Sequence, residues 1–208
     1  MAGFASLPRL AIRNAAIPDS PRHSALVRIT HWINTLSFFG LLISGVAILL
    51  AHPRLYWGET GNLGTPSLID LPLPFVLTGQ TGWGRSLHFL AGWVCVLNGS
   101  LYVVSGLITR HWPPTYNLLQ RMTYLVVVAV AFPLTIWTGL AMSPAIASVF
   151  PVLVASLGGQ QSARTVHFFA AGFLVVFLLA HIAMVCLAGF KEHVQAMIPG
   201  YAPRKDRA

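Results

Sequence analysis

Two histidines near the carboxyl end of the chain, His167 and His181, have the residue type and the spacing of metal ligands on one helix. They lie in an apolar run and are fourteen residues apart. In an α-helix this spacing turns the second side chain to within roughly 40° of the first and separates them by about 21 Å. One helix would thus aim two imidazoles in a similar direction, near opposite sides of a bilayer core about 30 Å thick. Such a helix suits two metal centres stacked across a membrane. The alternative is two histidines that hydrogen-bond neighbouring helices.

The composition places this helix in a membrane. Of the 208 residues, 55% are hydrophobic and only 9% are charged, whereas about a quarter of a soluble domain is charged. Four apolar runs are long enough to cross a bilayer, and they cover about residues 28–50, 87–108, 120–142 and 165–189. The expected fold class is therefore an all-α membrane protein, a bundle of four transmembrane helices. Pro133 is expected to kink the third helix.

The basic residues predict the orientation of the bundle. Ten of the thirteen Lys and Arg residues lie before the first run, between the second and third, or after the fourth. The positive-inside rule makes these segments, and hence both termini, cytoplasmic. We expect a cytoplasmic tail at 1–27, a membrane domain at 28–190 and a second cytoplasmic tail at 191–208. Because the bases flank apolar runs and form no face, the net charge of +8 does not indicate a nucleic-acid partner.

This orientation gives each span histidine a depth. His31 begins the first run on the cytoplasmic side, and His88 begins the second run on the opposite side. The fourth run places His167 outside and His181 toward the cytoplasm. The result is an outer pair, His88 with His167, and an inner pair, His31 with His181. Two haems, each with a histidine on both faces of the iron, need this set of ligands. Structural or proton-relay histidines are the alternative.

The two cysteines do not indicate another metal centre. Cys95 and Cys186 each lie inside an apolar run, and the sequence contains no Cys-x-x-Cys pair. It therefore has neither an iron–sulfur ligand pattern nor the attachment motif of a covalent c-type haem. Both cysteines are expected to be small buried apolar residues.

Arginines and glycines near the histidines fit a haem site. Arg28, Arg85 and Arg164 each precede a span histidine by three residues, so they are candidates to pair with haem propionates. Anchoring of the helix ends at the membrane interface is the alternative. Glycines in the spans would let a flat macrocycle approach a helix, or would pack helices together. They are Gly40, Gly45, Gly92 and Gly172.

A long connection, Ala51–Ser86, separates the first two runs and is rich in glycine and proline. Connections of this length are usually functional. Its aromatic residues Tyr56, Trp57 and Trp83 could contact the membrane face or a partner protein. A solvated, variable loop is the alternative.

The four-span plan, His31 and His88 opening the first two spans, and the fourteen-residue spacing of His167 and His181 resemble the bacterial di-haem cytochrome b family. This family includes the b-type subunits of nickel–iron hydrogenases, formate dehydrogenase and thiosulfate reductase, and the small cytochromes b561. The resemblance covers about residues 22–195. It implies two haem b groups, a location in the bacterial inner membrane, and electron transfer with a quinone, either menaquinone or ubiquinone.

The resemblance also implies a partner. The chain is expected to be the membrane subunit of a respiratory oxidoreductase, passing electrons between the quinone pool and a periplasmic redox subunit, a molybdopterin or iron–sulfur protein. The long first periplasmic loop is closer to the thiosulfate-reductase-like branch than to the formate dehydrogenase subunit. The alternative is a self-sufficient cytochrome b561-type quinone oxidoreductase that acts on a small periplasmic redox species. The sequence has no dinucleotide fingerprint and few acidic residues for acid–base catalysis.

A quinone site is expected on the cytoplasmic side. The run from Tyr116 to Arg121 is similar to a segment of the formate dehydrogenase subunit near its quinone site. Tyr116, Asn117 and Gln120 precede the third span at the depth of the inner pair, and the amides can bind a quinone carbonyl or a quinol hydroxyl. Asn117 could also cap the third helix.

Overall fold

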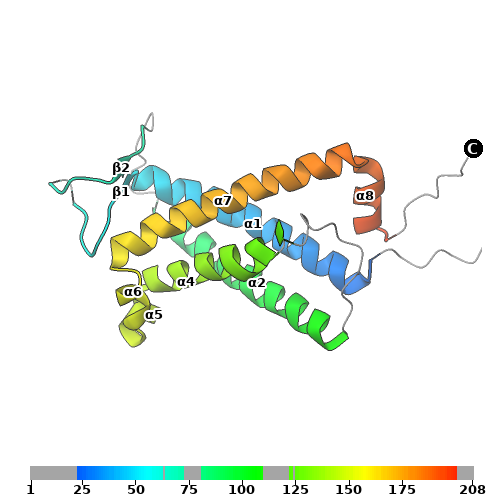
Figure 1. Cartoon of the computed structure of the whole chain (residues 1–208), viewed down its shortest axis with the longest axis horizontal. Coiled ribbons are helices and arrows are strands. Elements are labelled where there is room, and N and C mark those ends of the chain that lie inside the picture. The colour runs from blue at the N-terminus through cyan, green and yellow to red at the C-terminus, as the bar shows by residue number, and fades with distance from the viewer. Residues whose placement is uncertain (1–22, 63, 73–80, 110–121, 124, 201–208) are drawn as a thin grey trace, which may run out of the picture.

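The computed structural model of the chain describes residues 23–62, 64–72, 81–109, 122–123 and 125–200. In this part the chain forms an elongated helical bundle (Figure 1). Its long helices are α1 (Ala25–Ala51), α2 (Thr81–Thr109), a π-helical segment (Val127–Ala131) that continues into α4 (Phe132–Met142), and α7 (Gln160–Leu187). Short helices follow α4 and α7, namely α5 (Pro144–Val149), α6 (Val152–Ala155) and α8 (Phe190–Met197).

Three of the described helices are long and apolar enough to cross a membrane: Ala25–Ala51, Gly82–Thr109 and Gln160–Leu187. A shorter apolar helix, Val127–Met142, lies in the third of the expected runs. The chain is therefore a multi-pass helical membrane protein. The first and fourth helices begin before the apolar runs do, because Ser24 caps α1 by accepting a hydrogen bond from the Val27 amide and a loop carbonyl caps α7.

The bundle consists of two helix pairs, α1 against α2 and α4 against α7. Small residues bring the first pair together, since a Cβ at Gly40 would lie 3.3 Å from the Ala91 Cβ. Asn98 of α2 is buried and donates to the Thr30 carbonyl at 2.7 Å and to the Asn34 Oδ1 at 2.8 Å. In an apolar surrounding such contacts fix two helices against each other.

The interruption expected at Pro133 takes the form of a π-helical turn directly before it. Proline has no amide proton, and its ring crowds the carbonyl four residues earlier. The π turn at Val127–Ala131 changes the backbone pairing there, so that the helix continues into α4 with Pro133 in its first turn.

An apolar cluster fills the middle of the bundle between the outer and inner histidines. Its centre is Leu174, which lies seven residues after His167 and seven before His181 on α7. Leu174 is 4% exposed. The cluster joins α1, the π-helical segment, α4 and α7, and its other members are Val127, Ala131, Phe38, Phe132 and Phe177.

A small hairpin marks one end of the bundle, which we call the hairpin end (Figure 1). Strand β1 (Arg54–Leu55) pairs antiparallel with β2 (Ile69–Asp70). The Arg54 Nε and the Asp70 Oδ2 form an ion pair at 3.0 Å. Asp70 is the main reason that the pKa of Arg54 is raised above its ordinary value. The hairpin thus gives regular structure to part of the connection between α1 and α2.

The hairpin connection caps α7. The Gly58 carbonyl accepts from the amides of Gln161 at 2.9 Å and Ser162 at 3.3 Å, and the Ser162 Oγ accepts from the Gly58 amide at 2.7 Å. The Thr165 hydroxyl donates to the Tyr56 carbonyl at 2.6 Å. These bonds satisfy amides that a helix cannot pair internally. The loop and the histidine-bearing helix α7 therefore form one unit.

Gly159→Ala is expected to loosen this unit. Gly159 has φ +123° and ψ 169°, a conformation that only glycine adopts readily, at a cost of about 1–3 kcal/mol for other residues. A Cβ there would also lie 2.4 Å from the Gly58 carbonyl. We expect a lower melting temperature and faster proteolysis of the hairpin connection. Gly82→Ala is the control, because Gly82 lies in α2 without a positive φ and a Cβ there would meet no atom within 4 Å. Equal stability of both variants would contradict the prediction.

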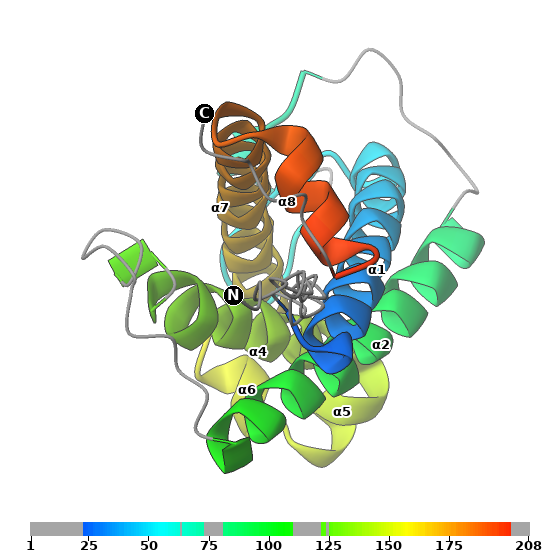
Figure 2. The same cartoon turned by 90° about the vertical axis from the view of Figure 1, so that its right-hand side faces the viewer.

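Helix α8 marks the other end, the α8 end. Figure 2 shows α8 crossing this end of the bundle from α7 toward α1. The Arg28 Nη1 donates to the Ile198 carbonyl at 2.8 Å, and the Trp32 indole donates to the Met197 carbonyl at 2.9 Å. The described chain therefore begins and ends at the same end of the bundle, and part of the expected cytoplasmic tail at 191–208 is helical.

Candidate metal centre

The structure brings His88 and His167 together across the bundle. His88 lies on α2 and His167 on α7, and both are half-buried near the hairpin end. Their ring centroids are 6.2 Å apart, and their planes make an angle of 64°. The spatial pairing that the sequence predicts for these two residues is therefore present in the fold.

This spacing fits one metal held between the two rings. Two metal–nitrogen bonds of about 2.0 Å each, together with the two ring radii, amount to roughly 6 Å. Within the described residues no group of three or more His, Cys, Asp or Glu side chains forms a metal site. A pair of histidines suits a haem iron, because the macrocycle supplies the remaining ligands. The residues present thus fit a haem with two axial histidines.

A buried hydroxyl contacts each of these imidazoles. The Ser44 Oγ on α1 lies 3.0 Å from the His88 Nδ1, and the Thr138 Oγ1 on α4 lies 2.9 Å from the His167 Nδ1. Ser44 and Thr138 are both 0% exposed. Each histidine is therefore held by the helix that is paired with its own.

A glycine follows each hydroxyl and lies beside the histidine ring. A Cβ at Gly45 would lie 3.6 Å from the His88 Cε1, and a Cβ at Gly139 would lie 3.5 Å from the His167 Cε1. Of the other glycines expected near a haem, Gly40 packs two helices, and Gly172 has no atom within 4 Å of such a Cβ. Ser44, Thr138 and Gly139 were not predicted. The repeated hydroxyl–glycine dipeptide in the first and third apolar runs was the available signal.

The inner pair consists of His31 on α1 and His181 on α7. His181 stacks on Phe177, with ring centroids 6.3 Å apart and an angle of 29°. His31 meets the Trp32 ring edge-on, with centroids 5.6 Å apart. Aromatic side chains thus surround this pair, in contrast to the hydroxyls at the outer pair.

Two of the three arginines proposed for haem propionates bind backbone carbonyls at the helix ends. The Arg164 guanidinium donates to the His52 carbonyl, and Arg28 donates to Ile198. The Arg28 Nε is buried without a hydrogen-bond partner among the described residues. Arg85 is exposed. A guanidinium has five N–H donors, so these contacts leave others for a carboxylate.

The pKa of His52, just after α1, is affected by positive charges at the hairpin end. Its partial burial, together with the positive charges of Arg164 and Arg85, holds the pKa of His52 below its ordinary value. The positive charges of both guanidinium groups thus disfavour protonation of His52, in addition to its partial burial. This end of the bundle has a positive field that suits carboxylates.

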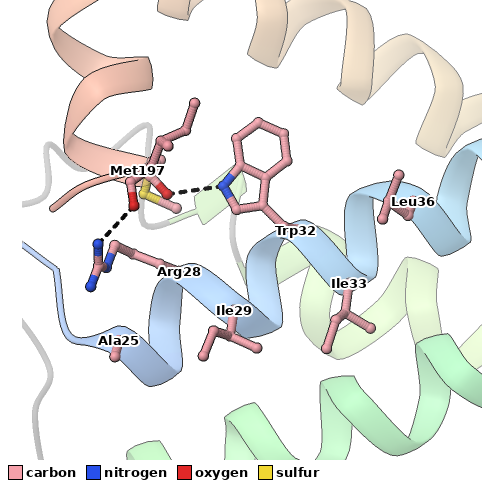
Figure 3. A pocket seen from close by; sticks show the side chains of 8 residues that line it. Ala25, Arg28, Ile29, Trp32, Ile33, Leu36 and Met197 are labelled. Atoms are coloured by element: carbon pink, nitrogen blue, oxygen red, sulfur yellow. Dashed lines mark hydrogen bonds between the residues drawn. The ribbon is translucent and has the colours of Figure 1, made fainter.

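A pocket of about 390 Å³ opens at the α8 end, close to His31. Figure 3 shows the Arg28 and Trp32 side chains pointing toward the last turn of α8. The rest of the wall is mainly apolar, and its other residues are Ala25, Ile29, Ile33, Leu36, Met197 and Ile198. The predicted quinone residues Tyr116, Asn117 and Gln120 lie outside the described residues.

A helical membrane protein with opposed histidines between its spans has the architecture of a membrane cytochrome b. The sequence profile of the prokaryotic cytochrome b561 family matches residues 22–200, and the chain belongs to this family. The family predicted from the histidine pattern is thus confirmed. The protein is accordingly a membrane protein that binds b-type haem and transfers electrons.

One curated relative is the putative protein-methionine-sulfoxide reductase subunit YedZ1 of Azospira oryzae. It is 29% identical over 212 residues, which cover 86% of this chain and 96% of the relative. No solved structure matches the chain significantly.

Proposed function

We propose that the chain is a di-haem cytochrome b of the bacterial inner membrane that transfers electrons between the quinone pool and a periplasmic redox subunit. The observation that carries the proposal is the opposed His88–His167 pair, with ring centroids 6.2 Å apart. A haem iron, when bound, supplies one-electron oxidation and reduction. The chain's own residues hold and orient that group. The apolar cluster around Leu174 separates the outer histidine pair from the inner one.

In this proposal the outer haem has His88 and His167 as axial ligands, and the inner haem has His31 and His181. The fourteen-residue spacing of His167 and His181 on α7 supports the second assignment. Arg85 and Arg164 supply positive charge for propionates at the outer haem, and Arg28 does so at the inner haem. The fourteen-residue spacing on α7 separates the two levels by about 21 Å.

The proposed topology has four spans, with the hairpin end in the periplasm and the α8 end in the cytoplasm. Two observations support it. The described chain begins and ends at the α8 end, as an even number of crossings requires. In the sequence, ten of the thirteen Lys and Arg residues lie before the first apolar run, between the second and third, or after the fourth, and the positive-inside rule assigns these segments to the cytoplasm.

The proposed partner is a separate catalytic subunit on the periplasmic side, either a molybdopterin or an iron–sulfur protein. The relative YedZ1 is named as a subunit of a putative reductase, and the two chains match over 96% of its length. The hairpin connection is the proposed docking surface. Trp57 and Leu68 are 61% and 58% exposed there, and aromatic side chains are enriched in protein interfaces.

Two measurements on the purified protein test the proposal. A pyridine haemochrome assay should give about two b haems per chain. Purification in mild detergent should recover a soluble redox subunit in fixed ratio. A stable protein without haem would overturn the assignment of the histidines. A chain that purifies alone and itself reduces a small oxidant with quinol would instead favour the self-sufficient oxidoreductase.

The quinone is proposed to bind at the cytoplasmic end, next to the inner haem. Tyr116, Asn117 and Gln120 are the proposed hydrogen-bonding residues, and the apolar pocket near His31 supports a quinone at this depth. Asn117→Ala is expected to slow reduction of the inner haem by quinol severalfold while both haem spectra stay intact. Stopped-flow spectroscopy measures this rate. Leu36→Trp, which narrows the pocket, is the comparison: if it alone slows the reaction, the quinone binds in the pocket and Asn117 has another role.

A further inference from the structure

The outer pair is built from two similar half-sites. In each, one helix contributes a hydroxyl followed by a glycine, and its partner helix contributes a histidine. The Ser44–Gly45 dipeptide of α1 contacts His88, and the Thr138–Gly139 dipeptide of α4 contacts His167. Both hydroxyls have the imidazole Nδ1 within hydrogen-bond distance, at 3.0 Å and 2.9 Å. The same contact thus occurs on both sides of the site.

The proton of each hydroxyl is committed to its own helix. The Ser44 Oγ lies 2.6 Å from the Gly40 carbonyl oxygen, and the Thr138 Oγ1 lies 2.8 Å from the Leu134 carbonyl oxygen. Two oxygens at such distances need a hydrogen between them. A carbonyl has none to give, so the hydroxyl donates to it. The hydroxyl oxygen then offers a lone pair to the imidazole.

The contact therefore determines the tautomer of each histidine. The Nδ1 nitrogen must donate its hydrogen, since the hydroxyl proton points elsewhere. The hydroxyl oxygen accepts it, and the backbone carbonyls of Leu41 beside His88 and of Thr135 beside His167 are further acceptors. In a neutral imidazole the other nitrogen, Nε2, then has the free lone pair. A metal ligand requires that lone pair. Both rings are thus prepared to bind a metal through Nε2, with an orientation fixed by a fully buried acceptor.

We propose that Ser44 and Thr138 are positioning residues that orient the two outer axial histidines and strengthen them as electron donors, and thereby lower the reduction potential of the outer haem. This inference rests on the proposed ligation of that haem by His88 and His167. An acceptor at the far nitrogen raises the basicity of a ligating imidazole. A more basic ligand stabilises the oxidised iron, and hydrogen bonding near a haem is an established means of tuning its potential.

The inner pair provides an internal reference. Among the described residues the imidazoles of His31 and His181 have aromatic neighbours, Trp32 and Phe177, and no hydroxyl in contact. Removing Ser44 or Thr138 should therefore change one haem and leave the other unchanged. A general loss of structure would affect both haems.

Thr138→Val is the decisive variant, because it keeps the shape of the side chain and removes the acceptor. Redox titration followed in the visible spectrum should show an upward shift of one of two midpoint potentials. Electron paramagnetic resonance should show a change in one of two low-spin ferric signals. Thr138→Ser should retain both wild-type values. Ser44→Ala should raise the midpoint potential of the same haem. This second variant tests the inference if Thr138→Val fails to assemble.

Thr135→Val is the matched control. Thr135 lies one turn earlier on α4, and its hydroxyl bonds the Ala131 carbonyl at 2.8 Å. This variant should leave both potentials unchanged. Two bound haems with unaltered potentials in Thr138→Val and Ser44→Ala would overturn the inference and leave the proposed function intact. An equal shift in Thr138→Ser would also overturn it. A wild-type protein without two haems would overturn the proposed function itself.

Discussion

His167→Ala is expected to reduce the haem content from about two per chain to about one. In the proposed site the two outer histidines, with ring centroids 6.2 Å apart, would both bind the iron, and one remaining histidine would be too few for a six-coordinate site. The remaining haem should keep a low-spin spectrum, because His31 and His181 lie more than two helical turns away from the substitution. The pyridine haemochrome assay and the visible spectrum measure both quantities.

Substitutions of the other histidines test whether the loss of haem is specific to the outer pair. His88→Ala should remove the same haem as His167→Ala, whereas His181→Ala should remove the other. His193→Ala is the control, because His193 lies on α8 and its Nδ1 contacts the Gly189 carbonyl at 2.8 Å. Two haems in His167→Ala would mean that the outer ligands are different residues.

Electron transfer from a periplasmic donor to the inner haem should be nearly abolished in His88→Ala and His167→Ala. The outer and inner levels are separated by about 21 Å along α7, with the Leu174 cluster between them. In the proposed topology, a donor at the hairpin end would therefore depend on the outer haem as a relay. Quinol, at the α8 end, should still reduce the inner haem in these variants.

Rapid mixing of the reduced partner, or of a small periplasmic reductant, with membranes oriented in one direction measures the first rate. Quinol added to the same membranes measures the second. His181→Ala should give the reverse result, with the outer haem still reduced by the partner and no longer by quinol. An inner haem that follows the periplasmic donor at the wild-type rate in His88→Ala would show that the order of the relay is wrong.

The helical class and the pairing of the outer histidines could be predicted from the sequence, for a physical reason. A membrane confines each span to one direction and one length, so that a residue's place in a span gives its depth. The positive-inside rule then relates the depths of different spans. His88 and His167 could therefore be assigned to the same membrane depth from the sequence alone, although they are distant in the sequence. Few soluble proteins impose such a constraint.

The hydroxyls of the site could not be predicted in this way. Serine and threonine in membrane helices usually bond a carbonyl of their own helix, and Ser44 and Thr138 do so as well. Their second contact, to a histidine, depends on the rotation of two helices about their axes. Depth alone does not determine that rotation. Gly139 was missed for the same reason.

The first residue of α7 also could not be predicted from the sequence. The apolar run begins at about residue 165, but the helix begins at Gln160. The additional turn is stabilised by the Gly58 carbonyl, about a hundred residues earlier in the chain. A cap supplied from so far away leaves no local pattern. The kink at Pro133 is the opposite case, because its cause is a property of proline itself, and only its π-helical form needed the structure.

The two half-sites of the outer pair have a consequence for protein design. Each helix pair brings its own hydroxyl, its own glycine and its own histidine, with an arginine one turn before the histidine. A single two-helix peptide that associates with a second copy of itself would therefore contain every side chain that the outer site uses. Such a peptide dimer would reduce an opposed histidine pair of this kind to one short repeated unit.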